Sequence, residues 1–69
     1  MTNTELLQEK LNNSGYKMTF VVKELGITYQ ALLNKLNNKC EFTAGEITAL
    51  GILLHMTGKE VDRIFFMYD

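Results

Sequence analysis

The pattern that most constrains the fold of this chain is Thr-x-x-Glu, which occurs three times, beginning at Thr2, Thr43 and Thr57. In each copy the threonine hydroxyl and the glutamate carboxylate can each accept a backbone N–H that has no partner within the helix, which is the capping box that begins a helix. The sequence also contains no proline that would interrupt a helix. The chain is therefore predicted to fold into several short helices.

Other residues mark further helix boundaries. Thr28 is a fourth possible N-cap, and Gly15 and Gly26 suit the left-handed conformation in which many helices end. Asn38 can end a helix in the same way. Between these points the apolar residues recur at helical spacing, without the sustained alternation of a strand. We predict an all-α chain that forms a single domain over residues 1–69, with helices at residues 3–14, 18–25, 29–37, 44–55 and 58–67.

The apolar positions of these helices predict the core. One face of each helix is expected to turn inward, and Phe20 is expected to join it. Gly51 falls inside a predicted helix, where glycine costs about 1 kcal/mol relative to alanine, and a close helix crossing would explain its presence. The predicted inward residues are Leu6, Leu7, Leu11, Val21, Val22, Leu25, Leu32, Leu36, Ile47, Leu50, Leu53, Leu54, Val61, Ile64 and Phe65.

The charge of the chain is small in total and uneven in distribution. The 7 Lys+Arg and 8 Asp+Glu residues give a formal net charge of −1, which argues against a protein that binds nucleic acid over its whole surface. Residues 17–39 nevertheless carry four lysines and one glutamate, whereas residues 1–16 and 40–69 are both net acidic. A local basic surface is therefore predicted in the middle third of the chain.

No group of residues indicates catalysis or metal binding. The single Cys40 has no clustered cysteine or histidine, and His55 stands alone near the predicted end of a helix, where its charged form would suit the helix dipole. Glu60 and Asp62 diverge on a helix and form no catalytic pair. We expect no enzyme, no metal and no cofactor. The absence of an apolar leader or spanning segment predicts a cytoplasmic protein without a membrane partner.

Residues 18–39 contain the most informative pattern for function. One predicted helix ends at Gly26 and the next begins after Thr28, so the link is too short for antiparallel packing and sets the two helices at a steep angle. Val22 supplies the small β-branched side chain that suits a close crossing, and Ile27 supplies an apolar residue that fills the core after the glycine. This arrangement is typical of a helix-turn-helix.

A wider set of residues accompanies this pattern over nearly the whole chain. It consists of Gly15-Tyr16, VKELGIT at residues 22–28, NKLNNK at residues 34–39, Glu41-Phe42-Thr43, Glu46-Ile47 and Ile64-Phe65-Phe66. With these residues the chain resembles the phage repressor and Cro-type helix-turn-helix domains, especially the short prophage-encoded regulators of Gram-positive bacteria. The resemblance implies a compact five-helix lambda-repressor-like domain that regulates transcription by occupying an operator on double-stranded DNA.

The resemblance also implies roles for individual residues. Residues 29–37 would form the recognition helix in the major groove. There Gln30 or Asn34 could contact an adenine edge, and Leu33 could touch a thymine methyl group. The implied base contacts are Thr28, Tyr29, Gln30, Leu33 and Asn34, and the implied phosphate contacts, which position the domain, are Lys17, Thr19, Lys35, Asn38 and Lys39.

The C-terminal run at residues 64–68 is apolar on nearly every side of its predicted helix. The core is expected to take Ile64 and Phe65, which leaves Phe66, Met67 and Tyr68 for a second subunit or another protein. Operators with two-fold symmetry are bound by two-fold dimers, so a homodimer is expected.

Two apolar residues keep a second interpretation open. Met18 stands where the family often has a glutamine that contacts DNA, and Leu33 is apolar at an outward position. Together with the acidic last third, they favour a protein-interaction module with the same fold, which would modulate a partner repressor instead of binding DNA itself.

Overall fold

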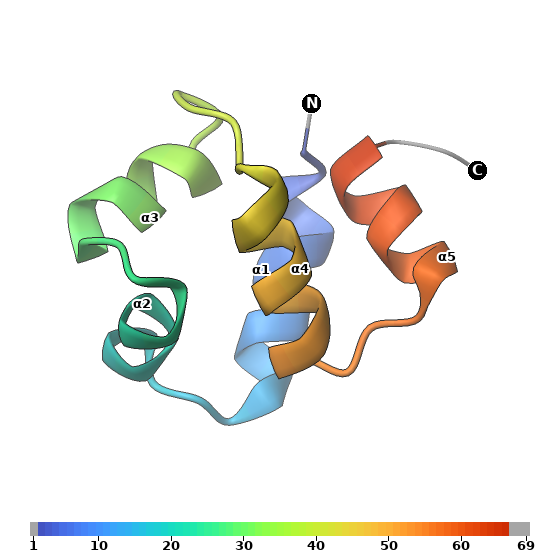
Figure 1. Cartoon of the computed structure of the whole chain (residues 1–69), viewed down its shortest axis with the longest axis horizontal. Coiled ribbons are helices and arrows are strands. Elements are labelled where there is room, and N and C mark those ends of the chain that lie inside the picture. Colours follow the sequence, from blue (N-terminus) through green and yellow to red (C-terminus); the bar gives the residue numbers. More distant parts are fainter. Residues whose placement is uncertain (1, 67–69) are drawn as a thin grey trace.

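The computed structural model describes residues 2–66, which fold into short helices joined by short loops (Figure 1). No strand occurs among these residues, so the all-α prediction is confirmed, and none of their helices has the length and apolar character needed to cross a membrane. The principal extents are 30 × 24 × 20 Å. The helices are α1 (Thr4–Ser14), α2 (Met18–Leu25), α3 (Tyr29–Leu36), α4 (Ala44–Leu53) and α5 (Gly58–Val61), which continues into the π-helical turn η1 (Asp62–Phe66).

Two of the three predicted capping boxes are present. Thr43 and Thr57 each accept the backbone N–H of the glutamate three residues later, and that glutamate accepts the threonine N–H in return. The predicted box at Thr2 is wrong, because Asn3 is the N-cap of α1 and its side chain accepts the N–H of Leu6. The Asn3 N–H donates to the Ile64 carbonyl at 2.6 Å, which ties residue 3 to η1 and leaves Thr2 buried.

The helix ends follow the predicted residues closely. Gly15 and Gly26 adopt left-handed φ values of 80° and 71°, and Asn38 does so at 59°. The fourth helix is shorter than predicted, because its C-cap is Leu54 and His55 already lies in the left-handed region at φ 54°. The last predicted helix extends to residue 67, and the structure confirms it to Phe66, beyond which it lies outside the described residues.

The core forms where α1, α2, α3, α4 and η1 meet, and the predicted inward residues are either buried or packed against it. The prediction for Phe20 is wrong: 41% of its surface is exposed, and its ring lies against Tyr16 at a centroid distance of 5.1 Å. Phe42, which was not predicted, is buried edge-on against Phe65. The fully or nearly fully buried apolar residues are Leu7, Leu11, Val21, Leu32, Leu36, Phe42, Leu50, Ile64 and Phe65.

The close helix crossing expected at Gly51 is not tight enough to require a glycine. A Cβ atom at this position would meet Val61 Cγ2 at 3.5 Å, which is ordinary van der Waals contact. We therefore expect Gly51→Ala to raise the free energy of unfolding by about 1 kcal/mol, because alanine removes the entropic cost of a helical glycine. Urea unfolding followed by circular dichroism measures this change. The matched control is Gly26→Ala, which should lower stability by about 1–2 kcal/mol because Gly26 has a positive φ; a stability loss in Gly51→Ala would contradict the account.

Candidate nucleic-acid interface

The helices α2 and α3 lie side by side at the end of the molecule farthest from α5 (Figure 1). The chain turns between them at Gly26, whose N–H donates to the Lys23 carbonyl, while the Ile27 N–H donates to the Val22 carbonyl at 3.1 Å. Thr28 then caps α3 by accepting the Ala31 N–H at 3.0 Å. These bonds fix the start of α3 relative to α2.

The two faces of α3 differ sharply in exposure. Leu32 is completely buried and Leu36 is nearly so, which anchors the inner face in the core. At the start of the helix Thr28, Tyr29 and Gln30 are all exposed, and 49% of the Tyr29 surface is open to solvent. Three of the five predicted base-contact residues therefore lie together on an accessible polar surface.

A fourth predicted residue, Asn34, is joined to this surface by a hydrogen bond. The amide nitrogen Nε2 of Gln30 donates to Oδ1 of Asn34 at 3.1 Å, across one turn of α3. Asn34 is partly exposed. The two amides therefore act as a linked pair and not as two independent side chains.

The fifth predicted residue, Leu33, is half-buried and faces a shallow apolar groove. Met18 at the start of α2 lines the same groove. Amide side chains from α1 and from the end of α3 also line it. The groove has a volume of about 210 Å³ and is lined by Gln8, Leu11, Asn12, Met18, Leu33, Leu36 and Asn37.

Four of the five predicted phosphate-contact residues are exposed. They are Lys17 and Thr19 at the start of α2, and Asn38 and Lys39 in the loop after α3. Lys17 is the N-cap of α2 but its side chain makes no capping hydrogen bond. The ammonium groups of Lys17 and Lys39 have no salt bridge among the described residues.

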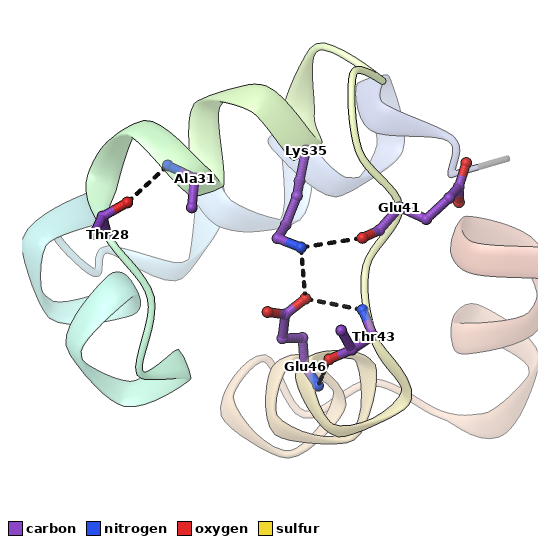
Figure 2. Close-up of polar contacts among 6 residues, drawn as sticks. All are labelled: Thr28, Ala31, Lys35, Glu41, Thr43 and Glu46. Atoms are coloured by element: carbon purple, nitrogen blue, oxygen red, sulfur yellow. Dashed lines mark hydrogen bonds and ion pairs between the residues drawn. The ribbon is translucent and has the colours of Figure 1, made fainter.

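Lys35 differs from these four residues, because its ammonium group is engaged within the domain (Figure 2). Its Nζ donates to the Glu41 carbonyl at 3.0 Å and lies 3.1 Å from Oε1 of Glu46 at the start of α4. The Lys35 and Glu46 side chains are only 12% and 11% exposed, and Nζ also stands 5.8 Å from the centre of the Phe42 ring. We therefore assign Lys35 the structural role of joining α3 to α4.

The carboxylate of Glu46 serves both this ion pair and the helix cap. Oε1 accepts the Thr43 N–H at 2.9 Å while it faces Lys35 (Figure 2). Burial alone would raise the pKa of Glu46, but the Thr43 N–H and the Lys35 ammonium together outweigh burial and hold the pKa below its usual value. At Glu60 the Lys10 ammonium, followed by the Thr57 N–H, likewise lowers the pKa.

These lowered pKa values predict that the domain loses stability in acid. A carboxyl whose pKa is lower in the folded state stabilises the fold above its unfolded pKa, which is about 4.3 for glutamate, and loses that contribution as pH falls through the folded value. The free energy of unfolding in urea should therefore decline between about pH 5 and pH 3. Glu46→Gln, which keeps an acceptor for the Thr43 N–H, should flatten the decline. A profile in which the variant falls as steeply as the parent would show that Glu46 is not responsible.

Large apolar residues are also exposed outside α2 and α3. Of the predicted dimer residues, Phe66 is 49% exposed, whereas Met67 and Tyr68 lie outside the described residues. Ile52, which lies outside the predicted inward set, is 73% exposed. Ile52 lies on a groove of about 540 Å³ between α4 and α5, with Gly51, Met56 and Val61.

Within residues 2–66 no group of three or more His, Cys, Asp or Glu side chains gathers in a way that could hold a metal ion, and Cys40 is exposed.

Comparison of the chain with protein-family models, with curated proteins and with solved structures finds no match. The resemblance to phage repressor and Cro-type domains therefore remains a prediction from the sequence.

Proposed function

We propose that this chain is a sequence-specific DNA-binding transcriptional regulator of the phage repressor type. In it, α2, the link at Gly26 and α3 act as a helix-turn-helix, with α3 in the major groove. The observation that supports this most strongly is the division of α3. One face is fixed in the core by Leu32 and Leu36, and the start of the opposite face presents Thr28 and Gln30 to solvent.

The exposed residues have the chemistry that DNA contacts need. The Gln30 amide can both donate to and accept from a base edge, and Tyr29 offers a hydroxyl group and an aromatic face. Four further exposed residues precede or follow the predicted recognition helix in the sequence, namely Lys17, Thr19, Asn38 and Lys39. In the proposed complex they bind phosphates and position α3, while the bases are recognised by α3 itself.

The charge distribution predicts weak dependence of binding on salt. With Lys35 engaged by Glu46, the predicted phosphate contacts include two lysines per protomer, Lys17 and Lys39. A dimer with four such contacts should show a slope of log K against log salt concentration of about −3.6. The acidic remainder of the chain adds little general attraction to DNA.

The proposed operator complex contains two protomers, because two half-sites about one DNA turn apart require a two-fold assembly. The half-exposed Phe66 ring supports an apolar contact between protomers at the C-terminal end. Sedimentation equilibrium of the chain with and without operator DNA tests this part of the proposal, and a 1:1 complex on a full palindromic site would refute it.

Selection from a pool of random DNA duplexes tests the proposed function. The folded chain should enrich one short sequence with two-fold symmetry, and a mobility-shift assay should then show tight binding to that duplex and weak binding to a scrambled one. If the folded chain enriches no sequence at low salt, the proposal is wrong. Gly51→Ala is the matched control, since it lies on α4 and should not alter the enriched sequence.

The groove at Met18 and Leu33 supports a second candidate function. Its apolar and amide side chains would suit an apolar side chain of a protein partner, so that the domain would modulate a repressor encoded beside it. In that case co-purification with the neighbouring repressor should survive Gln30→Ala and fail on Leu33→Asp. Loss of the complex on Gln30→Ala alone would count against this function.

A further inference from the structure

We infer that Asn34 is a positioning residue that fixes the orientation of the Gln30 amide, so that α3 recognises one adenine in each half-site. This inference rests on the proposed function. The observation behind it is the hydrogen bond from Gln30 Nε2 to Asn34 Oδ1, at 3.1 Å on the exposed surface of α3. Because Asn34 accepts, the nitrogen of the Gln30 amide is turned toward it and the oxygen is turned away.

The bond to Asn34 uses only one of the groups that Gln30 can offer. A primary amide has two N–H donors and one carbonyl acceptor. In the inferred arrangement the N–H on the Cγ side is committed to Asn34, so that the second N–H and Oε1 lie on one edge of the planar amide group. This edge carries one donor and one acceptor side by side, with the donor nearer to Asn34.

Adenine is the base that this edge fits. In the major groove adenine exposes the N7 acceptor beside the N6 amino donor, which pairs with a donor and an acceptor together. Guanine exposes two acceptors, N7 and O6, and would set its O6 against Oε1 of Gln30. Cytosine and thymine each offer a single hydrogen-bonding group there, so neither satisfies both atoms of the edge.

Asn34 matters because a free glutamine amide can present this edge in two senses. Rotation by half a turn about its terminal bond exchanges the donor and the acceptor, and the exchanged form would oppose like groups on the same adenine. The bond to Asn34 favours one sense before DNA is bound, which reduces the ordering cost of the contact. Asn34 therefore acts through Gln30 on base discrimination.

The test measures discrimination at single adenines and not affinity alone. The probe is the enriched duplex in which one adenine at a time is replaced by 7-deazaadenine, which lacks the N7 acceptor and still pairs with thymine. For the parent chain, one position per half-site should weaken binding by about 10-fold or more. Gln30→Ala should bind the two duplexes equally, and Asn34→Ala should reduce the discrimination at least about threefold.

Asn34→Asp distinguishes the inferred orientation from its opposite. A carboxylate can still accept from Gln30 Nε2 but cannot donate to Oε1. The variant should keep the parent's discrimination, although its added negative charge lowers affinity for every duplex. The inference is overturned if Asn34→Asp loses discrimination as Asn34→Ala does, or if Asn34→Ala keeps it in full. A parent chain that enriches no duplex removes the proposed function itself, and this inference with it.

Discussion

Replacement of Leu32 by alanine is expected to lower the free energy of unfolding by about 3 kcal/mol. Leu32 is completely buried in the core at the centre of α3, and truncating it removes apolar contacts and leaves a cavity. A small domain is commonly stable by only about 5 kcal/mol, so the variant should keep about 2 kcal/mol of stability and melt well below the parent. Thermal and urea unfolding followed by circular dichroism measure the loss.

The next residue provides the matched control. Leu33 is half-buried at the groove with Met18, so Leu33→Ala should cost less than about 1.5 kcal/mol. The pair tests which face of α3 turns inward, because the two substitutions remove the same atoms from adjacent positions. Equal losses at the two positions, or a larger loss at Leu33, would contradict the described orientation of the helix.

Lys35→Met is expected to lower the free energy of unfolding by about 2–3 kcal/mol. The substitution leaves the Glu46 carboxylate without its partner in a site where both side chains are nearly covered. The residual exposure keeps the cost below that of a fully buried pair. Urea unfolding at neutral pH measures this loss of stability. Below the melting temperature of the variant, its binding to the enriched duplex should keep the parent's salt slope.

A double variant isolates the uncompensated charge. Lys35→Met combined with Glu46→Gln removes both charges and keeps an acceptor for the Thr43 N–H, so it should recover most of the lost stability. A double variant as unstable as Lys35→Met would show that packing, and not the stranded charge, sets the cost. If instead the slope of log K against log salt concentration becomes smaller in magnitude by about one per protomer in Lys35→Met, Lys35 contacts a phosphate as the sequence predicted.

The local features of the fold could be predicted from the sequence because they depend on short-range chemistry. The capping boxes at Thr43 and Thr57, the cap at Thr28 and the left-handed turn at Gly26 each involve residues within a few positions of one another. The capping box predicted at Thr2 did not form. Asn3 caps α1 instead, and its N–H donates to the Ile64 carbonyl, a contact distant in sequence that no local pattern contains.

The candidate site could be predicted in part for the same reason. Periodicity placed Leu32 inward correctly, and the exposed position of Gln30 agrees with what the resemblance implied. It could not show that Lys35 turns toward Glu46, because that depends on where α4 packs, nor that Phe20 stays exposed beside Tyr16. The bond between Gln30 and Asn34 was also missed, although their spacing of four residues on a helix permits it.

Amide NMR of the labelled chain, titrated with the enriched duplex, tests whether the exposed face at the start of α3 contacts DNA. We expect the largest chemical-shift changes at Thr28, Tyr29, Gln30 and Asn34, smaller changes at Lys17 and Lys39, and much weaker changes with a scrambled duplex. Changes concentrated on α4 and α5, or equal changes with both duplexes, would contradict the proposed contact.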